Sequence, residues 1–270
     1  MTETLSLRAK IEQSPMGAYQ WMIVVMAAIM NLLDGFDVLA LAFTATAIRG
    51  EFGLTGIELG YLLSAGLFGM TAGSLFLAPL ADKIGRRPLL LMAVSLSAIG
   101  MLGSAFISQY QWLGFWRVIT GLGVGGILVG TNVITSEYSS RKWRSFAISV
   151  YAAGFGIGAV LGGMFAVMLQ GEYGWRSVFL AGAILTGLLL VVLFIWLPES
   201  IDFLTSKQPK NAEVRLNLIA KRIGLDGDWK LPEKMEKIKT KLPISQLFSE
   251  KYLHSTLLIW TAFFAIMFSF

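Results

Sequence analysis

Six long apolar blocks, separated by short charged segments, are the feature that most constrains how this chain can fold. A helix needs about 20 apolar residues to cross the hydrocarbon core of a bilayer. Each block below is long enough to do so, and each is therefore predicted to be a spanning helix of an all-α membrane protein. The blocks cover residues 19–48, 55–80, 88–107, 113–136, 145–169 and 177–197.

The composition supports this prediction. Of the 270 residues, 55% are hydrophobic and only 14% are charged. A soluble domain carries about 25% charged residues and does not need so much apolar surface. The sequence contains no cysteine, which excludes a disulfide framework and thiolate metal sites.

Two charged segments and a further apolar block set the expected domain boundaries. Residues 1–18 are polar, and residues 201–251 are rich in Lys, Glu and Asp. Within the second segment, 211–224 has the pattern of an amphipathic helix that ends at a glycine. A seventh apolar block begins at Tyr252 and is still apolar at Phe270, so we expect the chain to be a fragment. The predicted parts are an N-terminal segment (1–18), a six-helix domain (19–200), a cytoplasmic linker (201–251) and the start of a second membrane domain (252–270).

The positions of Lys and Arg predict how the helices run through the membrane. With the N-terminus placed inside, 19 of the 22 basic residues fall on inner segments. Only Arg49 and Arg176 fall outside, and Arg117 lies within the fourth block. Because cytoplasmic loops collect Lys and Arg, we expect a multi-pass protein with its N-terminus in the cytoplasm. The pI near 9.4 follows from this asymmetry, and no nucleic-acid partner is expected.

The segment between the second and third blocks reads 78-APLADKIGRRPLLL-91. Its order of residues resembles the signature loop of the major facilitator superfamily, with Ala78 in place of the usual first glycine. The resemblance implies a 12-helix, 6+6 fold built from inverted three-helix repeats, of which this chain is the N-terminal half plus a partial seventh helix. It also implies that Asp82, Gly85, Arg86 and Arg87 form a gating loop, with Asp82 paired to the basic end of a neighbouring helix. The competing interpretation is a simple positive loop.

The segment 137-EYSSRKWRSF-146 is similar to the second charge cluster of the same superfamily. The resemblance makes Glu137 and Arg144 further members of the cytoplasmic gate. Single exposed charges contribute little to stability. A set of charges that pair with one another at a moving interface can shift the equilibrium between two conformations by a few kcal/mol.

Gly121, Gly123 and Gly126 in the fourth block match a dinucleotide-binding spacing. No strand precedes them and their flanks are apolar, so we predict close helix packing and no cofactor. Arg117, followed by Gly121, Gly123 and Gly125, resembles the fourth-helix motif of the superfamily. A buried arginine in a spanning helix indicates a functional site, and the alternative is snorkelling to the membrane surface.

Asp34 and Asp37 are acids within the first apolar block, three residues apart and on one helix face. With a rise of 1.5 Å per residue, they lie about 22 and 27 Å from the inner end, at a depth similar to that of Arg117. An ion pair with Arg117 would lower the cost of burial, or a proton could neutralise one acid while the arginine binds substrate. We expect Gly35 to permit local unwinding. The competing interpretation is a pair exposed in an outer aqueous vestibule.

The string Asp34-Gly35-Phe36-Asp37 is similar to the first helix of the aromatic acid:proton symporter subfamily. This resemblance implies a bacterial inner-membrane carrier, monomeric and without cofactor, that imports benzoate-type or protocatechuate-type acids or muconate together with protons. It makes Asp34 and Asp37 necessary for transport. Aromatic and polar residues of the spans are candidates for lining the substrate path: Phe36, Phe43, Tyr61 and Asn132.

Two further motifs agree with uptake. The fifth block, 154-GFGIGAVLGG-163, has Ala159 where exporters of the antiporter type carry proline, and 197-LPES-200 resembles the end of this half in solute-uptake members. A carrier of the same fold for a cationic or neutral solute, such as a sugar or a quaternary amine, is the alternative. A membrane enzyme is not favoured, because the single histidine, His254, lies at a membrane edge without other metal ligands.

Overall fold

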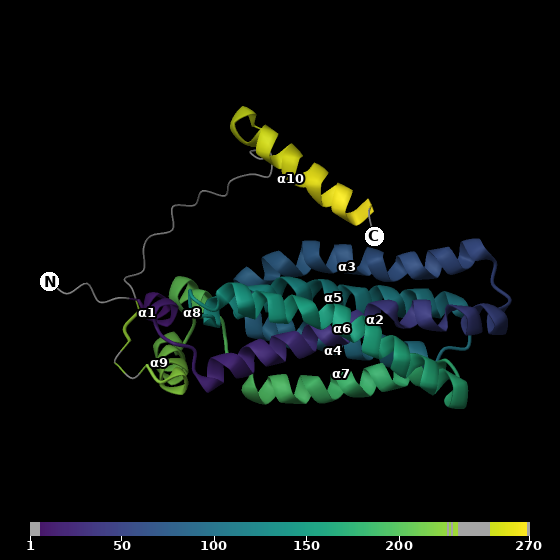
Figure 1. The fold of residues 1–270 in the computed structure, drawn as a ribbon, viewed down its shortest axis with the longest axis horizontal. Coiled ribbons are helices and arrows are strands. Elements are labelled where there is room, and N and C mark those ends of the chain that lie inside the picture. The colour runs from purple at the N-terminus through teal and green to yellow at the C-terminus, as the bar shows by residue number, and fades with distance from the viewer. Residues whose placement is uncertain (1–5, 226, 228, 232–248, 269–270) are drawn as a thin grey trace. The chain divides into compact units, whose positions relative to one another are not determined.

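The computed structural model describes residues 6–225, 227, 229–231 and 249–268, and the regular elements of this described part are all helices (Figure 1). Six of them are long: α2 (Ala18–Phe52), α3 (Gly56–Ile84), α4 (Arg86–Ala105), α5 (Tyr110–Tyr138), α6 (Arg144–Tyr173) and α7 (Arg176–Trp196). All six are long and apolar enough to cross a membrane. The predicted spans are therefore confirmed, with ends that differ by a few residues.

Four shorter elements complete the described chain: α1 (Leu7–Gln13), α8 (Ile201–Lys207), α9 (Ala212–Ile223) and α10 (Glu250–Phe268). The predicted amphipathic helix is α9, and Gly224 ends it in a left-handed conformation. The helices α1 and α8 were not predicted. They lie with α9 at one end of the six-helix bundle (Figure 1).

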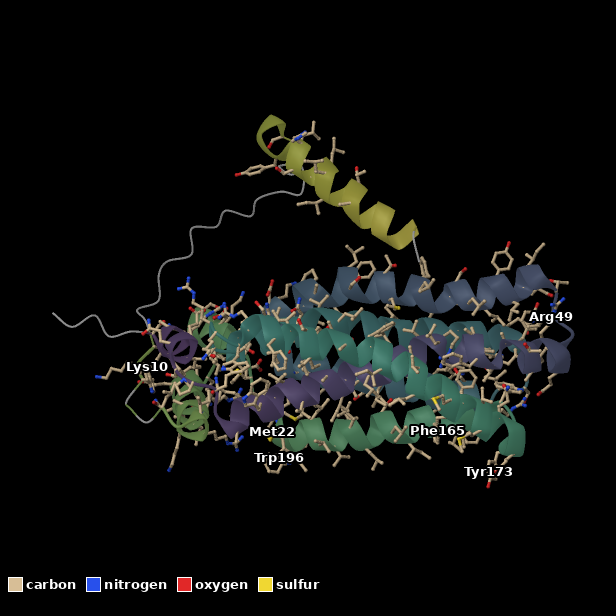
Figure 2. The ribbon with its side chains drawn as sticks, viewed as in Figure 1. Lys10, Met22, Arg49, Phe165, Tyr173 and Trp196 are labelled. Atoms are coloured by element: carbon tan, nitrogen blue, oxygen red, sulfur yellow. The ribbon has the colours of Figure 1, made fainter. Side chains whose placement is uncertain are left out.

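The chain forms two compact units, Met1–Leu231 and Pro232–Phe270. The first contains the bundle together with α1, α8 and α9, so part of the segment expected to be a linker packs on the bundle. The second contains α10, which covers the seventh apolar block. Figure 2 shows the side chains of both units, with Lys10 at the end of the bundle that carries α1, and Arg49 and Tyr173 at the opposite end.

Local sequence explains where several helices begin and end. The Thr55 hydroxyl accepts from the backbone amide of Glu58, and the Glu58 carboxylate accepts from the backbone amide of Thr55. This pair satisfies amide groups that a helix start leaves free. Gly85 separates α3 from α4 with a φ of +103°, a conformation that residues with a side chain rarely adopt.

Helices pack at very short distances where glycine faces a neighbouring backbone. A Cβ added at Gly158 of α6 would overlap the carbonyl group of Leu32 in α2. On α5, Gly121 and Gly125 face the backbone of α3, while Gly123 faces Ala93 of α4. The expectation that the fourth-block glycines serve close packing is confirmed, since small residues are what allow helices to approach in lipid.

Gly35 serves packing as well. The helix α2 is continuous from Ala18 to Phe52, so the predicted local unwinding at Gly35 is wrong. A Cβ at this position would overlap the carbonyl of Phe155 in α6. The glycine between the two aspartates is needed because two backbones meet there.

We expect Gly158→Ala to destabilise the protein by about 1–3 kcal/mol, because the added methyl group has no space against α2. Thermal unfolding of the purified full-length protein in detergent measures this effect. Gly171→Ala is the matched control, since Gly171 lies on the same helix with no heavy atom within 4 Å of an added Cβ. Equal melting temperatures for the two variants would contradict this account of the α2–α6 contact.

Candidate functional site

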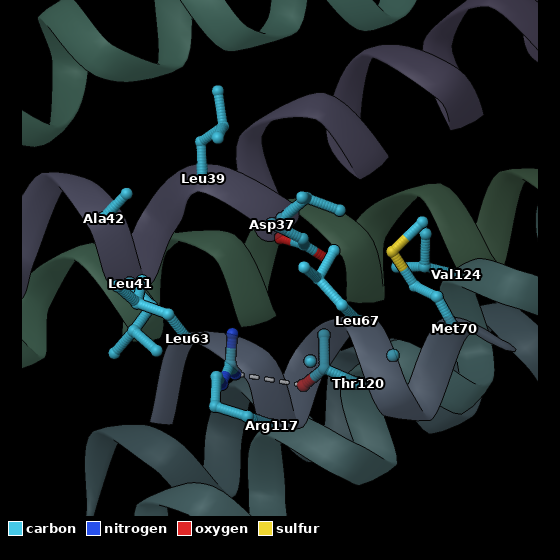
Figure 3. A pocket seen from close by; sticks show the side chains of 13 residues that line it. Asp37, Leu39, Leu41, Ala42, Leu63, Leu67, Met70, Arg117, Thr120 and Val124 are labelled. Atoms are coloured by element: carbon cyan, nitrogen blue, oxygen red, sulfur yellow. Dashed lines mark hydrogen bonds between the residues drawn. The ribbon is translucent and has the colours of Figure 1, made fainter. Parts of the chain in front are cut away.

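A pocket of about 170 Å³ lies between α2, α3 and α5. Figure 3 shows Asp37 of α2 on one side of it and Arg117 and Thr120 of α5 on the other. Most of its wall is apolar. Besides the three polar residues, the lining consists of Val38, Leu39, Leu41, Ala42, Leu63, Gly66, Leu67, Met70, Gly121 and Val124.

Arg117 is almost fully buried, with 3% of its surface exposed. Its guanidinium donates to the hydroxyls of Ser104 at 2.8 Å and Thr120 at 2.9 Å, and to the carbonyl of Gly100 at 3.3 Å. It also lies over the ring of Phe179, 4.8 Å from the centroid. These partners are all neutral, so no direct contact with a described residue compensates the positive charge of the arginine.

Asp37 is 2% exposed and accepts a hydrogen bond from the Ser97 hydroxyl at 2.6 Å. Its second oxygen, Oδ1, has no hydrogen-bond partner among the described residues. Within the described part of the chain, no ion pair within 4.0 Å joins Asp37 to Arg117. The two charges thus share a pocket without touching, and the direct ion pair considered from the sequence is absent.

The helix α4 supplies the hydroxyls that hold both groups. Ser97 donates to Asp37, and Ser104 accepts from Arg117. Seven residues are close to two helical turns, so the two serines lie on one face of α4. The acid and the base are therefore held at separate positions along a single helix.

Asp34 is also buried, at 2% exposure, but it does not line the pocket. Its Oδ2 has no partner in the described structure, and neither does Oδ1 of Asn31, one turn earlier on the same face. The amide nitrogen of Asn31 donates to the carbonyl of Tyr151 at 2.8 Å. The two aspartates are enclosed, so the interpretation of an exposed pair in an aqueous vestibule is not supported by this geometry.

The predicted gating loop is organised around Glu199. Its Oε1 accepts hydrogen bonds from the backbone amides of Arg86 at 2.8 Å, Arg87 at 3.1 Å and Ser200 at 3.0 Å. A Cβ on Gly85 would overlap this carboxylate. Glu199 therefore binds the N-terminus of α4, where free amides and the helix dipole favour a negative charge. Asp82 pairs with Arg86 at 2.6 Å, and Arg86 is the first residue of α4, so the acid meets the basic start of the next helix.

Among the described residues, Glu137 and Arg144 form no direct ion pair with each other or with Asp82. Glu137 accepts from the Ser200 hydroxyl and the Ile201 amide, both at 2.9 Å, at the start of α8. Arg144 donates to Glu12 of α1 at 2.7 Å, and this bond lowers the pKa of the Glu12 carboxyl. Each residue fixes a different short helix to the end of the bundle, and their joint role in a gate stays a prediction.

The comparisons with known proteins now identify the family. Residues 27–270 match the family model described as Major Facilitator Superfamily. The chain belongs to the Major Facilitator Superfamily. The buried arginine, the glycine contacts of α5 and the Gly85 turn are thus features of a member of this superfamily.

Curated relatives extend the comparison. The chain is 34% identical to the gallate transporter of Pseudomonas putida over 94% of its own length and 57% of that protein. It is 32% identical to the 4-hydroxybenzoate transporter PcaK of Pseudomonas putida over 97% of its length and 59% of that protein. The chain therefore spans a little over half the length of these curated relatives.

A solved structure supports the fold of this superfamily member. The xylose transporter XylE from E. coli, in a partially occluded inward-open conformation, superposes with a TM-score of 0.68 at 22% sequence identity. The match covers 77% of this chain and 56% of that chain. At this level of identity the similarity concerns the fold alone, and it agrees with the predicted six-helix half of a 6+6 architecture.

The residues suggested as substrate lining do not line the pocket of this Major Facilitator Superfamily chain. Phe36 is buried against Gly162 and Gly182, and Phe43 packs beside Gly163, so both fill helix interfaces. Tyr61 is 72% exposed and Asn132 is exposed, and their role stays a prediction.

Sequence reasoning missed Ser97, Ser104, Thr120 and the part played by Glu199. The available signal for the serines was their spacing of seven residues in an apolar helix. Such a spacing places the two hydroxyl groups on one face of the helix, but it does not predict which charged side chain each of them binds.

We expect Glu199→Ala to lower the free energy of unfolding by about 1–3 kcal/mol, because three backbone amides lose their acceptor. Glu199→Gln should fall between this variant and the wild type, since an amide oxygen remains but the charge at the helix start is lost. Melting temperatures in detergent give the order. Glu213→Ala removes an exposed acid of α9 and is the control; a Glu199→Ala protein as stable as this control would contradict the assignment.

Proposed function

We propose that the full-length protein is a proton-coupled importer of an aromatic acid anion. The observation that carries the proposal is a mostly apolar pocket that holds Arg117 and Asp37 without an ion pair between them. The named activities of the relatives, a gallate transporter and a 4-hydroxybenzoate transporter, support the same class of substrate. The 6+6 architecture, with residues 19–200 as its first six-helix domain, is part of this proposal.

Arg117 is suited to attract a carboxylate. Its charge is buried among neutral hydrogen-bond partners, where the effective dielectric is low and an anion is attracted strongly. The surrounding leucine, valine and methionine side chains suit the apolar face of an aromatic ring. A benzoate-type anion combines these two requirements, because its charge lies at one edge of an otherwise apolar molecule.

Asp37 and Asp34 are suited to carry protons. A buried carboxylate oxygen without a partner is costly when charged, and one oxygen of each acid is in this position. Protonation removes the cost, and so does the approach of a cation or water when the pocket opens. Coupling follows if the acids take up protons from the outside, and release them when the pocket opens to the cytoplasm.

The Glu199 contacts and the Asp82–Arg86 pair are suited to act as a latch on the side of the N-terminus. They connect the start of α4 to the end of α7 and the end of α3. Several charged hydrogen bonds that break together can change the free-energy difference between two conformations of the carrier by a few kcal/mol. The proposed setting is a bacterial inner membrane, with the N-terminus in the cytoplasm and a monomeric carrier.

A carrier of cationic or neutral solutes is the second candidate, with the aspartates as partners of the solute. The unpaired positive charge of Arg117 in the same pocket speaks against a cationic solute, because like charges repel most strongly where the dielectric is low. A membrane enzyme is disfavoured by membership of a transporter superfamily.

We expect Asp34→Asn and Asp37→Asn each to abolish proton-driven uptake while the protein remains in the membrane. Asparagine keeps the size of the side chain but cannot exchange a proton. Uptake of labelled 4-hydroxybenzoate by cells expressing the full-length variants, measured from pH 5 to pH 8 in the presence and absence of a protonophore, tests this. Glu172→Gln, at an exposed acid of α6, is the control. Full uptake with an unchanged pH dependence in both aspartate variants would refute the coupling role.

Competition measurements test the substrate class separately. We expect benzoate-type acids, gallate or muconate to inhibit uptake, and sugars or quaternary amines to have no effect. Arg117→Gln should reduce affinity for the acids by roughly tenfold or more, since a charged hydrogen bond contributes about 1.5–3 kcal/mol. Inhibition by amines and not by acids would favour the second candidate.

A further inference from the structure

A second cavity, apart from the pocket of Asp37 and Arg117, lies where α9 meets the end of α7 and the starts of α2 and α4. It borders the Glu199 contacts that are proposed as a latch. Its volume is about 230 Å³. Three arginines and a tyrosine provide its polar side, and apolar residues provide the rest, apart from Glu199. The lining consists of Arg87, Arg215, Arg222, Tyr19, Glu199, Ile195, Leu197, Pro198, Leu218 and Ile219.

The three arginines have no carboxylate partners among the described residues. Within the described part of the chain, none of them lies within 4.0 Å of an acidic oxygen. Arg87 donates to the carbonyl of Phe194 at 2.6 Å, and its buried Nε has no partner among the described residues. Arg222 lies against the ring of Tyr19 and donates to its hydroxyl at 3.4 Å.

Glu199 does not neutralise this cavity. One of its oxygens, Oε1, already accepts from the backbone amides at the start of α4 and from Ser200. One carboxylate faces three guanidinium groups, so the cavity carries a net positive charge. A cavity of this kind is suited to an anion with several acceptor oxygens, because each guanidinium offers a fork of N–H donors.

The other side of the cavity consists of apolar residues near the end of a spanning helix. Ile195 lines it from the last turn of α7, where the neighbouring Phe194 and Trp196 are 66% and 50% exposed. Figure 2 shows Trp196 toward the end of the bundle that carries Lys10. Tryptophan is typical of the interface between lipid and water. Leu218 of α9 also lines the cavity and is 56% exposed, so apolar and basic surfaces meet in this cavity.

We propose that this cavity binds the phosphate group of an anionic phospholipid from the leaflet on the side of the N-terminus. Arg87, Arg215 and Arg222 contact the phosphate, and Ile195 and Leu218 contact the glycerol and the first part of an acyl chain. Basic pockets at the ends of spanning helices are suited to lipid headgroups. A free phosphate ion would use the arginines and leave the apolar side exposed, which is why the lipid is the better fit.

The consequence is a bound lipid that joins α9 to the bundle. Arg215 and Arg222 belong to α9, whereas Arg87 belongs to α4 and Ile195 to α7. A lipid whose phosphate and acyl chain are shared by these residues connects three elements that are distant in sequence. Lipid binding should therefore stabilise the folded protein.

The test uses purified full-length protein in detergent micelles, with phosphatidylglycerol, phosphatidylcholine or inorganic phosphate added. We expect phosphatidylglycerol to raise the melting temperature more than phosphatidylcholine does. The double variant Arg215→Gln/Arg222→Gln should lose most of this shift, with binding of phosphatidylglycerol weakened about tenfold or more. The double variant Lys210→Gln/Lys221→Gln removes the same charge from exposed residues outside the cavity and should keep the shift.

Two results would overturn the proposal. An equal shift in both double variants would show that general surface charge, and not this cavity, attracts the lipid. An arginine-dependent shift of the same size with inorganic phosphate would assign the cavity to a soluble anion. If the arginine double variant does not accumulate, Arg215→Gln alone gives the same test, since its exposed side chain forms no ion pair in the described structure.

Discussion

The direct contact of helix backbones at glycine is the interaction on which the rest of this bundle depends. Between helices in lipid there is little hydrophobic driving force, so association relies on close van der Waals packing. Gly158 and Gly35 bring α6 against α2, and Gly121 and Gly123 bring α5 against α3 and α4. Because α5 is held this near to α4, the short reach of a serine is enough to meet the guanidinium of Arg117.

The same closeness makes a buried charge tolerable without an opposite charge beside it. Isolated ions are expensive in an apolar environment, and an ion pair would be the usual compensation. Here hydroxyl groups of Ser97 and Ser104 provide hydrogen bonds to Asp37 and Arg117 separately. The arrangement leaves both charged groups available to other partners, which a tight ion pair would not.

The sequence allowed the spans and the level of Arg117 and Asp37 to be predicted, because segment length, charge position and helical rise determine them. It did not allow the partners of each side chain to be predicted. Phe36 was expected to contact the substrate, whereas in the structure its ring packs beside Gly162. Glu137 was expected in a gate, and the structure shows its carboxylate accepting from the first backbone amide of α8. Partners depend on which helices become neighbours, and a single sequence does not state these pairings. The sequence pattern likewise could not show that Gly35 serves packing, because the backbone it meets belongs to another helix, α6.

The helix α4 begins at the carboxylate of Glu199 and carries, further along, the two serines. With the 1.5 Å rise per residue of an α-helix, Ser97 and Ser104 lie about 16 and 27 Å along the helix axis from Arg86. A helix resists compression along its axis, so any axial displacement at its first turn reaches both serines almost undiminished. Both hydrogen bonds, to Asp37 and to Arg117, would then change at the same time. The helix α4 thus couples the Glu199 contacts at one end of the bundle mechanically to the hydrogen bonds that hold an acid of α2 and a base of α5.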